Sequence, residues 1–194
     1  MSEQKRIELN TPIGKLMFLN LRQPRKIDPS NEQEQPKYQA TIVFDEEAQK
    51  TEEFKKMRAA VKKAAEARWG EIPKKMRSPF KTPDDLENVP EGMQEGDVFV
   101  RLNSTSKPGV VDRNLEDILD DEQVYSGMYG RVNVQCYAWE HKQGGKGVSF
   151  GLGPVQKTGD GPRLGGGQKP AKNAFEALPT EDDDLGDDKD DGLL

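Results

Sequence analysis

The chain has 194 residues, of which 32% are hydrophobic and 33% are charged, and its formal net charge is -6. This length fits one domain of ordinary size together with polar segments that do not join a core. Because Cys136 is the only cysteine, an intramolecular disulfide and the usual cysteine-rich zinc sites are excluded. Since the N-terminus is polar and about eighteen consecutive apolar residues occur nowhere, we expect no membrane span and a cytoplasmic location.

The negative charge is concentrated near the C-terminus. Residues 181–191 contain eight acidic residues and one lysine, a local charge of about -7, which leaves the rest of the chain at about +1. Attraction to nucleic acid must therefore come from a local basic patch, because the body as a whole is nearly neutral.

The first expected elements are two strands, at residues 16–21 and 37–44, joined by a polar loop that contains prolines. In the second strand, apolar and polar residues alternate, which is typical of a strand with one buried face. The face that carries Phe44 is expected to belong to the core.

A helix is predicted over residues 46–69. Asp45 is the expected N-cap, Glu46 and Glu47 favour the first turn, and Gly70 is the expected stop. A helical spacing is shared by Phe54, Met57, Val61, Ala64, Ala65 and Arg68, so this stripe is expected to pack on the barrel.

Residues 71–96 are rich in proline, glycine and charge, and they form a long loop of the kind that is often functional. A strand is expected at 97–102, with Val98, Val100 and Leu102 on one face. A short extended piece should follow at 109–111, and at most a helical turn at 114–121.

Residues 125–139 alternate between two chemically different faces. The inward set is Met128, Gly130, Val132, Val134, Cys136 and Ala138. The outward set is Tyr129, Arg131, Asn133, Gln135, Tyr137 and Trp139. A turn at 142–147 and a strand with Val148, Phe150 and Leu152 inward then complete a hairpin. We expect a folded domain over 1–157, a flexible linker rich in glycine and proline over 158–180, and an acidic tail over 181–194.

The outward aromatic and basic face suits a protein that binds single-stranded nucleic acid, because such proteins stack bases on flat side chains and contact phosphates with cations. The candidate DNA-binding residues are Tyr129, Arg131, Tyr137, Trp139, Lys37, Arg25, Lys26, His141, Lys142, Lys146 and Lys157. In the alternative interpretation, Tyr137 and Trp139 pack under the loop 71–96 or under a partner protein, and the lysines are solvated surface.

The acidic tail is a second, independent signal. It can mimic a polyphosphate and compete for a basic groove until DNA displaces it, after which it is free to recruit partners. The residues expected to do so are Asp182, Asp183, Asp184, Asp187, Asp188, Asp190, Asp191, Leu193 and Leu194. The alternative is a tail that serves solubility alone.

Several stretches between residues 15 and 167 carry a family resemblance. They are 15–21 (KLMFLNL), 37–45 (KYQATIVFD), Trp69-Gly70, 125–132 (YSGMYGRV), 146–157 (KGVSFGLGPVQK), Asp160-Gly161 and 164–166 (LGG). In this order they resemble the phage single-stranded DNA-binding proteins with an OB fold. The resemblance implies a mainly β protein, a five-stranded OB-fold barrel with an inserted helix, sequence-tolerant coating of single strands, and a disordered acidic tail that meets replication or recombination proteins. The tail here ends in Leu193-Leu194, whereas tails of that family often end in an aromatic residue.

Enzyme chemistry finds little support, because His141 is the only histidine and the glycine clusters miss the spacings of phosphate loops and dinucleotide sites. We expect no metal and no cofactor. The runner-up function is an OB-fold adaptor that binds proteins and meets nucleic acid incidentally, and a nuclease is third. Stacking does not distinguish DNA from RNA, and a homodimer stays open.

Overall fold

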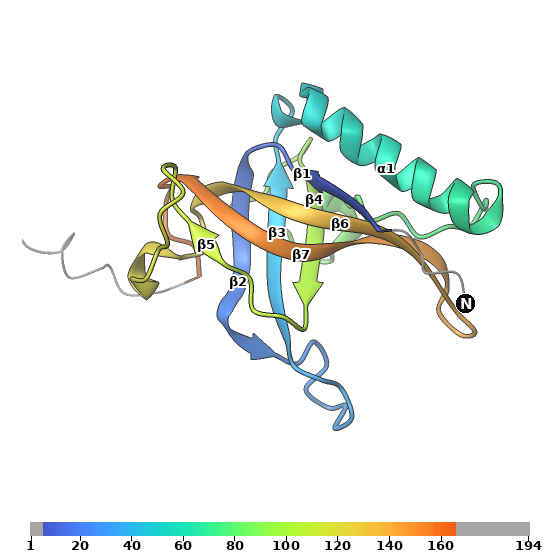
Figure 1. Cartoon of the computed structure of the whole chain (residues 1–194), viewed down its shortest axis with the longest axis horizontal. Helices are drawn as coiled ribbons and strands as arrows, with labels where there is room; N and C mark the ends of the chain where they lie inside the picture. The colour runs from blue at the N-terminus through green and yellow to red at the C-terminus, as the bar shows by residue number, and fades with distance from the viewer. Residues whose placement is uncertain (1–5, 166–194) are drawn as a thin grey trace, which may run out of the picture.

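The structure, a computed structural model, describes residues 6–165 and consists mainly of strands with one long helix (Figure 1). The elements are β1 (Ile7–Asn10), β2 (Gly14–Arg25), β3 (Lys37–Phe44), α1 (Glu52–Trp69), β4 (Val98–Ser104), β5 (Val110–Val111), β6 (Tyr129–His141) and β7 (Gly145–Gly159). Short 3-10 turns cover Ala48–Lys50, Pro83–Asp85 and Asp121–Gln123.

Five of the strands form a closed barrel. β2 pairs with β3 and with β6, β3 pairs with β4, and β6 pairs with β7, all antiparallel. The ring is closed by a parallel contact between β4 and β7, in which Asn103 lies opposite Gly151. A five-stranded Greek-key barrel is the core of the OB fold, so the predicted mainly β barrel with an inserted helix is confirmed.

β4 and β7 diverge beyond this contact, and the long loop fills the space between them. Lys81 pairs with Phe99 of β4, while Arg77 pairs with Gly147 of β7. Between these two points, Phe80 packs its ring against Phe54 of α1 and Phe150 of β7, with centroid distances of 5.4 and 5.9 Å. The loop 71–96 is therefore a structural part of the barrel wall.

Two strands lie outside the ring. β1 pairs with β6, and its Ile7 and Leu9 pack against the core, although we expected only a polar terminus there. A strand of four residues offers too few alternating positions to be detected from sequence, and its hydrogen-bonding partner is more than a hundred residues away. β5 pairs with β7 in parallel through Val110 and Val111.

The alternation predicted for β6 and β7 is confirmed. The inward sets of both strands are buried, from Met128 to Ala138 in β6 and at Val148, Phe150 and Leu152 in β7. Ile42 and Phe44 of β3 and Val100 of β4 join the same core. The outward set of β6 consequently faces away from the core.

The helix begins later than predicted. Asp45 precedes the 3-10 turn, where its Oδ1 accepts from the Ala48 N–H at 2.8 Å, and Thr51 is the N-cap of α1, accepting from the Phe54 N–H at 3.3 Å. The C-terminal prediction is confirmed, because Gly70 takes the left-handed conformation with φ 77°. Arg68 is exposed and Ala60 takes a place in the buried stripe instead.

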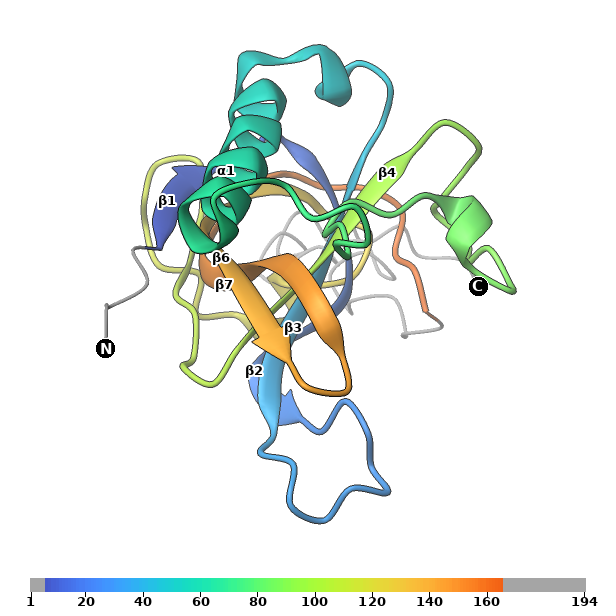
Figure 2. The same ribbon diagram turned by 90° about the vertical axis from the view of Figure 1, so that its right-hand side faces the viewer.

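α1 packs across β1, β6 and β7, and Figure 2 shows it over β1 and β6. Its anchor is Phe54, whose ring lies edge to face with Phe44 at 5.4 Å. None of the described helices is long and apolar enough to cross a membrane.

The folded body extends past the predicted boundary at residue 157. β7 continues to Gly159, the Tyr125 hydroxyl donates to Asp160 Oδ1 at 2.8 Å, and the Leu164 N–H donates to the Ser126 carbonyl at 2.9 Å. A linker beginning at 158 is therefore too early, because these residues bond to the segment before β6. The remainder of the predicted linker and the acidic tail 181–194 lie outside the described residues.

The inward position of Cys136 leads to the first testable expectation. Burial raises the pKa of this thiol to about 12, so at pH 8 the reactive thiolate is populated at only about one part in ten thousand in the folded protein. In the unfolded chain the thiol pKa is about 8.5, and roughly a quarter is thiolate at that pH. We expect a thiol-specific chromogenic reagent to label the protein promptly in urea and not under native conditions at pH 8. Prompt native labelling would contradict the register of β6.

Candidate nucleic-acid interface

A hollow with a volume of about 560 Å³ lies on the outer face of β2, β3 and β4. We call it the groove. Its floor and one end come from Phe18, Asn20, Ile27, Gln39, Ala40, Thr41, Phe99, Arg101, Leu102 and Asn103, and its wall comes from Leu86, Asn88, Pro90 and Met93 of the long loop. The groove thus joins the β2–β3 hairpin to the loop 71–96.

Phe18 gives the groove an exposed aromatic ring. Its side chain is 55% exposed, and its backbone has φ 50° at an irregularity between Met17 and Asn20 in the pairing of β2 with β3. A bulky residue in the left-handed region is under strain, and such strain concentrates at functional sites. The irregularity turns a flat apolar ring toward solvent beside the groove instead of into the core.

The groove floor combines apolar and hydrogen-bonding side chains and carries one exposed cation. The Arg101 guanidinium lies 5.6 Å from the centroid of the Phe99 ring, which is fully buried. Gln39 stands opposite Asn20 on one side and opposite Asn103 on the other. Hydrogen-bonding side chains therefore line the floor between Phe18 and Arg101.

This polar row continues around the barrel. Asn103 lies opposite Gly151 of β7, and Gly151 lies opposite Gln135 of β6. A methyl group added at Gly151 would approach Gln135 and the Tyr137 ring only at 3.7 to 3.9 Å, which is ordinary contact, so nothing packs tightly over this glycine. The outer face accordingly links the groove with the Tyr137 side of β6.

Three of the predicted basic residues gather at the β2–β3 end of the groove. Arg25 pairs with Lys37 across the hairpin, and Lys26 follows at once in the chain. Lys26 Nζ donates to the carbonyls of Asn31 and Glu32 at 3.1 Å each. The structure thus brings Arg25, Lys26 and Lys37 together beside a groove that the sequence did not identify.

A second group lies on the β6–β7 hairpin. Trp139 Nε1 donates to Ser149 Oγ at 2.8 Å, and the indole covers Gly147 so closely that a Cβ there would be 2.3 Å from the ring. The His141 ring is 5.2 Å away from that of Trp139, and the Arg6 guanidinium lies 5.4 Å from the Tyr137 ring. Both aromatics are half-buried, and these contacts come from β7 and the N-terminal arm.

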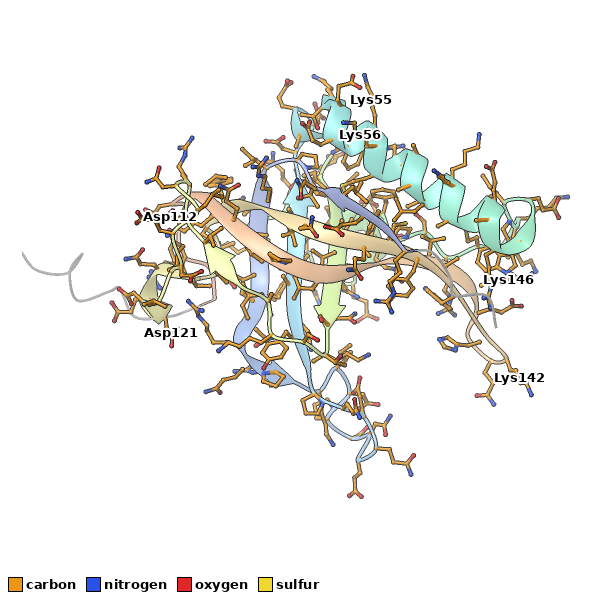
Figure 3. The ribbon with its side chains drawn as sticks, in the orientation of Figure 1. Lys55, Lys56, Asp112, Asp121, Lys142 and Lys146 are labelled. Atoms are coloured by element: carbon orange, nitrogen blue, oxygen red, sulfur yellow. The ribbon has the colours of Figure 1, made fainter. Side chains whose placement is uncertain are left out.

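The lysines of this hairpin differ in their surroundings. Lys142 is exposed at the tip, as Figure 3 shows, while Lys146 lies 3.9 Å from Glu140 and 5.5 Å from the Trp69 ring centroid. Trp69 Nε1 in turn donates to Glu140 at 3.2 Å. The end of α1 and the hairpin therefore form one surface.

Tyr129 and Arg131 lie at the opposite end of β6, where Lys157 of β7 pairs with Gly130. Tyr129 is ten residues, about 33 Å of strand, away from Trp139. The Lys157 side chain is only 12% exposed and forms an ion pair with Asp160 at 2.7 Å. Its Nζ also donates to the Gln123 carbonyl at 2.8 Å and lies 5.0 Å from the Tyr125 ring. Arg131 Nε donates to Gln156 Oε1 at 2.7 Å. Lys157 is therefore committed to intramolecular contacts.

The same contacts shift the pKa values of Asp160 and Tyr125. Hydrogen bonds from Lys157 and Tyr125 hold the pKa of the Asp160 carboxyl below its usual range. The pKa of the Tyr125 hydroxyl is raised, chiefly by burial and then by its hydrogen bond to Asp160. This end of the barrel is a closed polar cluster that fastens residues 157–163 to the body.

The sequence reasoning missed Phe18, Ile27 and Arg101. A usable signal existed for Arg101, because Phe99, Arg101 and Asn103 alternate with the inward residues of β4 just as the aromatic and basic residues do in β6. No such signal existed for Phe18, which stands in an almost continuous apolar run where alternation cannot assign a face. Within residues 6–165, no three histidine, cysteine or acidic side chains lie close enough together to hold a metal ion.

Comparison with known families gives one match over almost the whole chain. The model of a family described as Enterobacter phage Enc34, ssDNA-binding protein, matches residues 8–186. A protein of Acyrthosiphon pisum secondary endosymbiont phage 1, described as putative protein p50, is 26% identical over 156 residues, covering 76% of this chain and 83% of its own length.

Solved structures share the fold at low sequence identity. The single-stranded DNA-binding protein from bacteriophage Enc34 in complex with ssDNA matches with a TM-score of 0.65 at 15% identity, over 85% of this chain and 96% of its own. The protein gp2.5, a single-stranded DNA-binding protein encoded by bacteriophage T7, matches with a TM-score of 0.60 at 14% identity, over 90% of this chain and 100% of its own.

The structural role of Lys157 can be tested by measuring the free energy of unfolding. We expect Lys157→Ala to lower the free energy of unfolding by about 1–2 kcal/mol, because it removes an ion pair, a hydrogen bond and a contact with an aromatic face. The matched control Lys142→Ala, at the exposed hairpin tip, should change it by less than about 0.5 kcal/mol. Urea denaturation at neutral pH measures both.

The effect of Lys157→Ala on the free energy of unfolding should also depend on pH. Since the pKa of Asp160 is lowered in the folded state, its contribution is present above the ordinary aspartate pKa and is lost as the pH falls through the folded value. The stability difference between wild type and Lys157→Ala should therefore shrink in acid. A difference that stays constant into strong acid would contradict the assignment.

Proposed function

Because the chain belongs to the family of the single-stranded DNA-binding protein of Enterobacter phage Enc34, we propose that it coats and protects single-stranded DNA, without sequence preference, during phage DNA replication or recombination in the host cytoplasm. The observation that carries the proposal is the groove, in which the exposed Phe18 ring and Arg101 lie on the outer face of a closed five-stranded barrel. It is a binding role, and no catalytic step is assigned to it.

The position of the groove supports this role. In OB folds, the face of the second and third barrel strands, with the loops between strands 1 and 2 and between strands 4 and 5, binds oligonucleotides. Here the corresponding strands are β3 and β4, and the corresponding loops are the β2–β3 hairpin and the β6–β7 hairpin. Both predicted basic groups of the site lie on those two hairpins.

We propose that the strand runs from the β2–β3 end, across the groove, toward the β6–β7 hairpin. Phosphates meet Arg25, Lys26 and Lys37 at one end and Lys142 and Lys146 at the other. Bases stack on Phe18 and, where Gly151 leaves the surface open, on Tyr137. Each stacked base is worth roughly 1–3 kcal/mol, and the phosphate contacts make the affinity fall with salt.

The residue set inferred from the sequence changes accordingly. Trp139 and His141 stay at the edge of the path, where Trp139 also packs over Gly147. Tyr129, Arg131 and Lys157 are left out, because they lie at the far end of β6 and two of the three are engaged in side-chain hydrogen bonds or ion pairs. Phe18, Ile27 and Arg101 take their place.

An OB-fold adaptor for proteins is the alternative function. Its support is the same exposed aromatic surface, because tyrosine and tryptophan are common in protein interfaces. The acidic tail serves both functions. In the proposed DNA-binding function, Glu181 to Asp191 compete with DNA for the basic groups, and the terminal leucines recruit replication or recombination proteins.

Substitutions at Phe18 and Arg101, with a control at Arg131, test whether the groove binds DNA. We expect Phe18→Ala and Arg101→Ala each to weaken binding of oligo(dT) about tenfold, because each removes a stacking platform or a phosphate contact. Arg131→Ala, an arginine on the far end of β6, should change the affinity less than about twofold. Fluorescence titration at two salt concentrations measures the affinity. An effect of Arg131→Ala with none of Arg101→Ala would reject the groove.

The tail is tested by charge at constant length. We expect replacing the eight acids of 181–191 by asparagine and glutamine to tighten DNA binding, most strongly at low salt, because a tethered competitor is removed. Deletion of 181–194 should act in the same direction. Under the adaptor alternative, the neutral tail leaves the DNA affinity unchanged, and loss of the tail abolishes capture of partner proteins instead.

A further inference from the structure

The segment between β5 and the turn before β6 exposes two leucines. Leu115 is 71% exposed and Leu119 is 86% exposed, although neither lies in the groove. Six of the eleven residues at 112–122 are acidic, so the leucines stand in a strongly negative surround. We call residues 112–122 the acidic knob.

The acidic knob is held in a fixed shape. The Asp112 N–H donates to the Glu116 carbonyl and the Ile118 N–H donates to the Val110 carbonyl, both at 2.9 Å. Gln156 Nε2 donates to the Asp112 carbonyl at 3.2 Å. From the barrel, Arg22 donates to the Ile118 carbonyl and pairs with Asp121 at 2.8 Å. A loop with this many bonds presents its leucines in a preorganised position, which lowers the entropy cost of docking.

The backbone at Leu115 is strained, and the strained conformation leaves the side chain exposed. Its φ is 67°, in the left-handed region that leucine rarely adopts, and the strained residue points an apolar side chain to solvent. The Leu115 side chain gains little burial from this arrangement within one protomer. The cost is explained if the side chain is buried in a complex.

The opposite end of the molecule carries the complementary surface. Ile72 is 45% exposed just beyond α1, and it is flanked in the chain by the exposed cations Arg68, Lys74 and Lys75 and by one exposed acid, Glu71, so that residues 68–75 keep a net positive charge. The Arg77 N–H donates to the Lys146 carbonyl at 2.9 Å, which joins this segment to the β6–β7 hairpin. We call residues 68–75 the basic end.

The two surfaces lie far apart on the same chain. Figure 3 shows Asp112 and Asp121 at one end of the barrel and Lys142 and Lys146 at the other. In Figure 1, strands β2, β3 and β4, which carry the groove, are drawn between these ends. A contact between them therefore cannot form within one described body, but it can form between two copies that face the same way.

We propose that the acidic knob of one protomer docks on the basic end of the next protomer along the same DNA strand. The contact is heterologous and does not close into a ring, so it generates a linear array. Leu115 and Leu119 contact Ile72, and the acids face the lysines. The patches are small, so the contact is weak in free solution and takes effect when DNA holds two protomers at high local concentration. This inference rests on the proposed function.

The test separates binding from cooperativity. Leu115→Asn/Leu119→Asn in the full chain removes the apolar contact, and asparagine tolerates the left-handed backbone at 115. We expect its affinity for an oligo(dT) that holds one protomer to stay within twofold of wild type. On a long poly(dT) that holds many protomers, its cooperativity factor should fall at least tenfold. Ile13→Asn, at an apolar residue that is 52% exposed outside both surfaces, should change neither value.

A charge exchange tests the pairing itself. Glu116→Lys/Asp117→Lys and Lys74→Glu/Lys75→Glu should each lower the cooperativity factor, and the four changes in one chain should restore most of it, because the reversed charges again meet across protomers. Restoration is not expected if the four sites act separately.

Three results would overturn the inference. The first is unchanged cooperativity in the leucine variant. The second is an equal loss on the short oligonucleotide, since the knob would then act on DNA binding or folding. The third is loss of cooperativity only when the acidic tail is removed, which would assign the basic end to the tail. If wild type itself fails to bind the short oligonucleotide, the proposed function fails instead, and this outcome is distinguished by the first titration.

Discussion

The parallel contact of β4 with β7 is the constraint on which the other features of this molecule depend. Asn103 and Gly151 form the only register pair between those strands, yet that pair turns an antiparallel meander into a closed barrel. Because the strands diverge beyond it, the loop 71–96 must fill the wall, and it does so through Arg77, Phe80 and Lys81. The same loop then has its later residues free to wall the groove.

Closure also decides how the outward residues are grouped. On a flat hairpin, the outward set of β6 would be one continuous surface. On the barrel, the long β6 passes from the polar cluster around Asp160 to the hairpin beside α1, so its two ends have different neighbours. Tyr129 and Trp139 share a strand face but lie in different surroundings.

The sequence patterns correctly predicted the features that depend on residues near each other in the chain. The bounds of β3, the alternation of β6 and the stop at Gly70 follow from periodicity and backbone preference within a few residues. The N-cap was wrong because Asp45 and Thr51 are both good caps and only the intervening 3-10 turn chooses between them. The groove was missed because it is assembled from β2, β4 and a distant loop, and no short stretch encodes that meeting. The face of Phe18 depends on an irregularity in pairing, which a continuous apolar run does not reveal.

Among the described residues, Phe18 and Leu115 are the two non-glycine positions with positive φ, and both carry exposed apolar side chains. Substitution by glycine or asparagine at either position relieves backbone strain at little cost in packing. Selection for thermal stability alone would therefore favour those changes. With the roles proposed for Phe18 and Leu115, selection for performance on DNA would favour the original residues, so stability and activity would make opposite demands at these two positions and the same demand in the buried core.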